Sequence, residues 1–143
     1  MKRPGNWIRQ PRRRRREQAP AEAPAASPPA PKAGPGVLRV EVIEEDGRLR
    51  LRLDGELDLV TAPWLRRRLD KVEAEHPPIL VLDLRDLTFM DSSGLRELFS
   101  AQRRARAESR RLVLVKGSAP IDRVLEMVRA EQAVETVDDP ADV

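Results

Sequence analysis

The sequence predicts an α/β domain built around a mostly parallel β-sheet, on three observations. Two β-rich runs flank Asp46-Gly47, a dipeptide typical of a tight hairpin turn. The runs that follow alternate between strand-like apolar segments and stretches with helical spacing, which calls for right-handed crossovers between parallel strands. Each predicted helix carries a single apolar stripe, so it covers a sheet with one side. The order of elements is β-β-α-β-α-β-α, and residues 134–137 are expected to add a short final strand.

The opening hairpin combines a strand over residues 37–43 with a second strand over residues 49–53. Leucine alternates with arginine from Arg48 to Leu53, which indicates one buried and one solvent-facing side. Residues 54–58 are Asp-Gly-Glu-Leu-Asp, and their glycine and crowded acids favour a loop. This loop would carry the chain from the hairpin to the first helix.

The rest of the domain alternates helices and strands. The first helix can be capped by Thr61, has Pro63 just inside its start and ends near Glu75. The remaining predicted elements are a buried strand over residues 79–84, a helix over residues 92–108, a strand over residues 112–115 and a helix that follows Ser118. Residues 138–143 are expected to form a flexible C-terminus. Strand order within the sheet does not follow from these patterns.

Composition divides the chain into a tail and a domain. Residues 1–36 hold eight of the 13 prolines, and nine Lys/Arg against two acids give them a net charge of +7. Residues 37–143 carry 18 basic and 22 acidic residues, a net charge of −4. We therefore predict a disordered, basic, Pro/Ala-rich tail over residues 1–36 and a folded domain over residues 37–137. The run Arg12 to Arg16 attracts phosphates or anionic lipid by charge alone, and without a DNA-binding helix pattern we expect no specific nucleic-acid recognition.

Several classes of function lack the residues that they need. Cysteine is absent and His76 is the single histidine, which leaves no thiolate or histidine pair for a metal site or a catalytic dyad. The acid pair Glu56 and Asp58 has a spacing that is common in solvated corners, so we do not expect it to perform acid/base catalysis or to bind a metal. No run approaches the roughly 20 apolar residues of a membrane span, and no apolar signal core follows the basic start. We expect a soluble cytoplasmic protein without catalytic residues, metal or cofactor.

The most informative stretch lies where a predicted strand passes into the predicted helix that begins at Ser92. Asp91-Ser92-Ser93-Gly94 occupies this corner, and its small polar side chains accept hydrogen bonds from the free N–H groups of a first helical turn. The corner therefore presents a hydroxyl at the positive end of a helix dipole. Composition and spacing leave two interpretations open: Asp91 and Ser92 only cap the helix, or the hydroxyl has a regulatory role.

Two motifs resemble those of a known family. Residues 82–95, which include Leu82-Asp83-Leu84 and end in Phe89-Met90-Asp91-Ser92-Ser93-Gly94-Leu95, are similar to the signature of STAS domains of the bacterial anti-sigma factor antagonist (anti-anti-sigma factor) family. Residues 54–62, from Asp54-Gly55-Glu56-Leu57-Asp58 to Thr61-Ala62, resemble the second motif of that family. The resemblance covers roughly residues 37–137, with both motifs in the right order within the predicted β/α pattern.

The resemblance implies a STAS-like fold, a mixed sheet of four to five strands with helices packed mainly on one face. It also implies that an anti-sigma factor with serine kinase activity phosphorylates Ser92, the serine directly after the motif aspartate. In such a switch the unphosphorylated protein binds the anti-sigma factor and frees a sigma factor, and a PP2C-type phosphatase resets the phosphorylated form. We expect a monomer or weak dimer.

The resemblance also suggests roles for individual residues. Asp91 would orient and cap Ser92, Ser93 would support it, and Gly94 would allow close approach of the kinase. The partner-binding surface is expected to comprise Glu56, Asp58, Thr61, Asp91, Ser92, Ser93, Gly94 and Arg96. Two other interpretations stay open: a constitutive STAS docking subunit of a lipid-transport ABC complex or stress-signalling scaffold, and a nucleotide-binding or nucleotide-hydrolysing protein.

Overall fold

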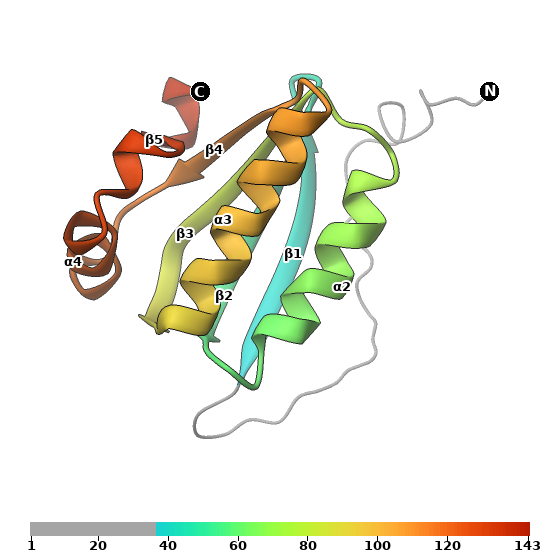
Figure 1. Cartoon of the computed structure of the whole chain (residues 1–143). Helices are drawn as coiled ribbons and strands as arrows, with labels where there is room; N and C mark the ends of the chain where they lie inside the picture. The colour runs from blue at the N-terminus through green and yellow to red at the C-terminus, as the bar shows by residue number, and fades with distance from the viewer. Residues whose placement is uncertain (1–36) are drawn as a thin grey trace.

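The computed structural model describes residues 37–143, so the predicted tail lies outside the described residues. The elements are β1 (Leu38–Glu45), β2 (Arg48–Leu57), α2 (Ala62–Glu73), β3 (Ile79–Met90), α3 (Ser92–Ala107), β4 (Arg111–Val115), α4 (Ala119–Met127), η1 (Ala130–Gln132), β5 (Glu135–Val137) and η2 (Pro140–Asp142). The strands form one sheet in the order β1-β2-β3-β4-β5 (Figure 1). β1 and β2 are antiparallel and all other neighbours are parallel. The predicted mixed sheet is confirmed.

The β1–β2 hairpin turns at the predicted dipeptide. Asp46 and Gly47 have φ angles of 50° and 77°, as the two central residues of a type I′ turn require. β2 is longer than predicted, because residues 54–57, which we expected in a loop, pair with β3 after two shifts in register. Gly55 has a φ of 119°, and a Cβ atom there would lie 2.4 Å from the carbonyl oxygen of Val37. The glycine that favoured a loop thus permits an irregularity inside a strand.

β3 also continues past its predicted end. Residues 79–84 are almost entirely buried, as expected of a central parallel strand. The strand then runs through residues 85–90, which lie beyond the predicted strand. Leu87 and Met90 remain buried there while Thr88 and Phe89 are exposed, so the additional strand residues still contribute to the core.

The helices cover one face of the sheet. α2 and α3 lie side by side across it (Figure 1), and α4 packs against β3 and η1. Leu69 of α2, Leu98 of α3 and Leu125 of α4 belong to one hydrophobic core that also contains the leucines of β2 and β3. The predicted packing of helices mainly on one face is confirmed. In the described part of the chain, every helix is too short or too polar to cross a bilayer.

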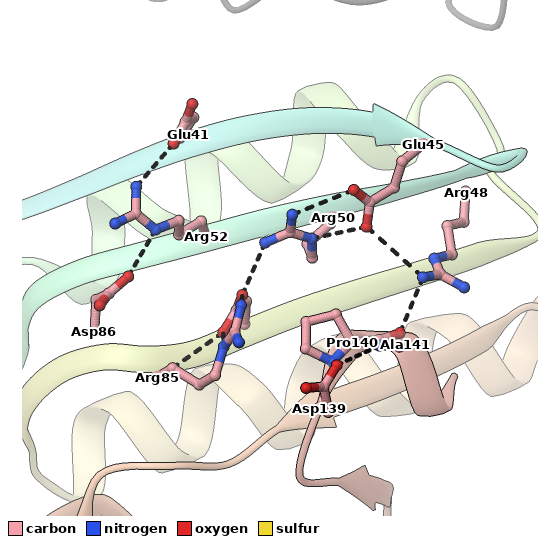
Figure 2. A network of polar contacts seen from close by, with 11 residues as sticks. Glu41, Glu45, Arg48, Arg50, Arg52, Arg85, Asp86, Asp139, Pro140 and Ala141 are labelled. Atoms are coloured by element: carbon pink, nitrogen blue, oxygen red, sulfur yellow. Dashed lines mark hydrogen bonds and ion pairs between the residues drawn. The ribbon is translucent and has the colours of Figure 1, made fainter.

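The opposite face carries a network of ion pairs (Figure 2). Arg50 donates to Asp83 and to Glu45, both at 2.9 Å, and Arg85 donates to the two carboxylate oxygens of Asp83 at 2.9 and 2.8 Å. Asp83 is fully buried. Burial opposes its ionisation, but the hydrogen bonds and charge of Arg85, together with the charge of Arg50, hold the pKa of Asp83 below its ordinary value. The arginines predicted to face solvent are therefore partly buried and paired.

The C-terminal residues differ from the expected flexible end. Asp139 accepts a hydrogen bond from the backbone N–H of Ala141 at 2.8 Å, which closes the short helix η2. Arg48 donates to the carbonyl oxygen of Pro140 at 2.9 Å (Figure 2). This bond ties the end of the chain to β2.

Candidate functional site

The site is the corner where β3 passes into α3. Asp91 is the N-cap of α3, and its Oδ1 atom accepts hydrogen bonds from the backbone N–H groups of Ser93 at 2.8 Å and Gly94 at 3.2 Å. These bonds satisfy two of the free donors in the first helical turn. The N–H of Asp91 donates to the carbonyl oxygen of Leu57 at 3.2 Å, which joins the corner to the end of β2. Asp91 thus has the capping role that we expected.

Ser92 is the first residue of α3, and it is exposed. Ser93 beside it is half-buried. Because the cap is supplied by Asp91, the hydroxyl of Ser92 is not needed to close the helix and lies open to a partner. A regulatory role for Ser92 requires this exposure, because a partner must reach the hydroxyl.

Gly94 is buried, and the close approach that it permits lies within the chain. A Cβ atom at this position would be 2.7 Å from Cγ of Leu57, 2.9 Å from the carbonyl oxygen of Leu57 and 2.9 Å from Cγ of Met90. No real Cβ atom sits so close to a backbone oxygen. The expected role of Gly94 in kinase approach is therefore replaced by a packing role: it lets the first turn of α3 lie against β2 and β3.

The second motif forms a locked turn between β2 and α2. The Oδ1 atom of Asp58 accepts from the N–H groups of Val60 at 2.9 Å and Thr61 at 3.0 Å, and the Thr61 hydroxyl donates to the carbonyl oxygen of Glu56 at 2.8 Å. Asp58 and Thr61 are only 8% and 4% exposed. Thr61 occupies the N-cap position of α2, but its side chain makes no capping bond. Asp58 and Thr61 thus shape the expected docking surface from beneath, whereas Glu56 is half-buried.

Three exposed apolar side chains border the corner, and sequence reasoning missed them. Leu59 and Val60, in the turn after β2, are each 72% exposed, and Phe89, near the end of β3, is 47% exposed. All three lie within three residues of the hydrogen bond between Leu57 and Asp91. We call them the apolar rim. The available signal was Leu59-Val60 itself, two consecutive apolar residues in a segment with no strand or helix period.

The charged residues of α3 differ in exposure and in pairing. Arg96 is exposed, four residues after Ser92 and hence on the same side of the helix, and its side chain makes no hydrogen bond or ion pair within residues 37–143. Glu97 and Arg104 instead face α2: Arg104 donates to Glu73 at 2.8 and 3.0 Å, and burial raises the pKa of Glu97. Of these, Arg96 is free to meet a partner or a phosphate.

The single histidine lies far from the corner. His76 follows α2, with its Nδ1 atom 3.8 Å from the carboxylate of Glu108, the C-cap of α3. Ser92 is at the other end of that helix. The corner therefore places no histidine beside the hydroxyl of Ser92.

Comparisons with known proteins agree with this geometry. The family model described as the STAS domain matches residues 39–142. The chain is similar to the anti-sigma F factor antagonist of Paenibacillus polymyxa, with 32% identity over 94 residues, covering 63% of this chain and 78% of the relative. It is also similar to the anti-sigma-F factor antagonist RsfB of Mycobacterium tuberculosis, with 31% identity over 86 residues, covering 60% of this chain and 70% of the relative.

Solved structures show the same fold. The crystal structure of an anti-sigma factor antagonist from Mycobacterium paratuberculosis superposes with a TM-score of 0.70 at 26% identity, covering 75% of this chain and 91% of that one. The anti-sigma factor antagonist SpoIIAA in its unphosphorylated form superposes with a TM-score of 0.57 at 20% identity, covering 74% and 92%.

Proposed function

Because this chain belongs to the STAS-domain family, we propose that it acts as an anti-sigma factor antagonist, as its relatives are named. In this proposal the unphosphorylated chain binds an anti-sigma factor and so releases a sigma factor, without catalysing a reaction itself. The observation that carries the proposal is the exposed hydroxyl of Ser92 at the start of a helix whose cap is already supplied by Asp91.

Ser92 is the proposed phosphorylation site. A phosphate adds about −1.5 to −2 charges at neutral pH. The positive end of the α3 dipole stabilises an anion at this position, and Asp91 keeps its own hydrogen bonds to the backbone. Phosphorylation is therefore expected to leave the fold intact and to change only what the surface can bind.

The apolar rim explains why a phosphate would prevent binding. Leu59, Val60 and Phe89 offer exposed apolar area of the kind that an interface buries at its centre. A partner seated on this rim would desolvate Ser92 as well. A doubly charged group within such an interface loses its water, and like-charge contacts there cost several kcal/mol.

The proposed partners are an anti-sigma factor with serine kinase activity and a PP2C-type phosphatase, acting together in the cytoplasm. The kinase supplies the phosphoryl group and the phosphatase removes it. The direct contact surface comprises the apolar rim with Glu56, Ser92, Ser93 and Arg96, positioned by the buried Asp58, Thr61 and Gly94.

Charge substitutions at two serines of α3 test the proposal. We expect Ser92→Asp to weaken binding of candidate anti-sigma factor kinases at least about tenfold in calorimetry, with an unchanged circular dichroism spectrum. Ser92→Ala should bind like the wild type and accept no phosphate. The matched control is Ser100→Asp, which adds the same charge two turns further along α3. Equal binding of wild type and Ser92→Asp would overturn the switch, and indifference to every change at Ser92 would indicate constitutive docking.

A further inference from the structure

A groove runs along the C-terminal half of α3, away from Ser92. Two adjoining hollows, of about 480 and 260 Å³, share Gln102 and Arg106 in their linings. The larger one is lined by Phe99, Gln102, Arg103, Arg106, Gln132 and Ala133, between α3 and η1. The smaller one continues past Ser109, Arg110, Arg111 and Leu112 to Glu135 of β5. We call the two hollows together the α3 groove.

The α3 groove carries an excess of positive charge. It is lined by four arginines, Arg103, Arg106, Arg110 and Arg111. Arg111 is paired with Glu135, and the Nε atom of Arg110 donates to Glu108 at 2.9 Å. The side chain of Arg103 donates only to the hydroxyl of Ser100, and the side chain of Arg106 makes no hydrogen bond or ion pair within residues 37–143. Two carboxylates against four guanidinium groups leave a net charge of about +2.

Arg110 is short of acceptors. Its side chain is 6% exposed, and its two terminal nitrogens are buried without a hydrogen-bond partner among the described residues. Buried donors on a charged group normally have hydrogen-bond partners, because a donor that has lost its water and gained no acceptor costs free energy. An anionic group that entered the smaller hollow would supply the missing acceptors as the guanidinium turned toward it.

We infer that the α3 groove binds an acidic segment of a protein partner, with a carboxylate held by Arg106 and Arg110 and a neighbouring apolar side chain against Phe99. Guanidinium groups match carboxylates in geometry as well as charge. The larger hollow is walled by the ring of Phe99 and by Ala133, which favours an apolar neighbour over a second charge. A peptide offers both kinds of group in one short segment.

This binding is separate from the proposed switch. Ser92 and Arg106 are 14 residues apart on α3, which places them about 21 Å from each other along the helix axis. Both sites can be occupied at once, so the groove would bind its segment whether or not Ser92 carries a phosphate. Failure of one proposal therefore leaves the other standing.

The test uses the full 143-residue chain labelled with ¹⁵N. The probe is a synthetic peptide with the sequence Glu-Asp-Leu-Phe-Glu-Asp, capped at both ends. We expect amide shifts at Gln102, Arg106, Ser109 and Ala133, and at least about tenfold weaker binding to Arg106→Glu. The matched control is Arg123→Glu on α4, an exposed arginine that lines neither hollow and should leave binding unchanged.

Three outcomes would overturn the inference. Equal shifts with sodium acetate or inorganic phosphate at the same anion concentration would indicate a small-anion site rather than a peptide site. A second outcome combines two results: vesicles of anionic phospholipid displace the peptide, and the peptide binds the Arg106→Glu variant as tightly as the wild type. The binding surface would then be one that recognises lipid, or the basic residues 1–36, rather than the α3 groove. Equal binding of a peptide in which lysine replaces each acid would remove the role of charge.

Discussion

Replacing Asp83 by asparagine tests whether the ion pairs on the sheet face opposite α2, α3 and α4 hold the domain together. Removing one partner of a buried ion pair costs about 3–5 kcal/mol, because the remaining charge is left without compensation. Here Arg50 keeps its bonds to Glu45, the guanidinium of Arg85 is partly open to water, and asparagine retains one acceptor oxygen. We therefore expect Asp83→Asn to lower the free energy of unfolding by about 2–3 kcal/mol at neutral pH.

The effect should depend on pH in a defined direction. The pKa of Asp83 in the folded chain lies below its ordinary value of 3.8, which applies to the unfolded chain. The stability that the ionised carboxylate contributes is then fully present above this ordinary value and is lost as the pH falls through the folded pKa. The difference in stability between wild type and Asp83→Asn should thus be constant near neutral pH and should shrink below about pH 4.

Urea unfolding followed by circular dichroism at several pH values measures this difference. The matched control is Asp86→Asn, which removes a carboxylate from the same face, where its side chain is 41% exposed and paired with Arg52. An exposed pair contributes about 0–1 kcal/mol, so the control should lose no more than that. A loss at Asp83→Asn below about 0.5 kcal/mol, or one that persists undiminished at pH 3, would refute the reasoning.

Two further changes probe the corner. Gly94→Ala should destabilise the fold by about 1–2 kcal/mol in the same assay, because overpacking against Leu57 and Met90 outweighs the gain in helix propensity; a stabilised variant would show that the corner has room for a Cβ atom. The double variant Leu59→Ser, Val60→Ser should leave the unfolding midpoint nearly unchanged while weakening anti-sigma factor binding about tenfold or more by calorimetry, and unchanged affinity would remove the apolar rim from the interface.

Local patterns were enough to predict most of the fold. The Asp46-Gly47 turn, the leucine alternation in β2 and the apolar stripes of the helices each depend on neighbours in sequence, and each is present in the structure. The extensions of β2 and β3 were not predictable in this way. They pair with each other across the sheet, so Gly55 and the residues around it form a strand because a distant segment offers hydrogen bonds.

The same distinction applies to the site. Asp91 and Ser92 were predictable because a helix cap is a local feature with a sequence signature. The burial of Asp58 and Thr61 was not, since it depends on a turn whose side chains bond to its own backbone. The pairing of Asp83 with Arg50 also joins residues 33 positions apart, which no periodicity reveals.

The most direct test of the switch is the affinity of an anti-sigma factor for this chain before and after enzymatic phosphorylation. The chain is incubated with a candidate anti-sigma factor kinase and ATP, the modified residue is mapped by mass spectrometry, and both forms are titrated by calorimetry. We expect one phosphate, on Ser92, and loss of measurable binding in the phosphorylated form. A phosphate on another residue, or equal affinity of the two forms, would contradict the account.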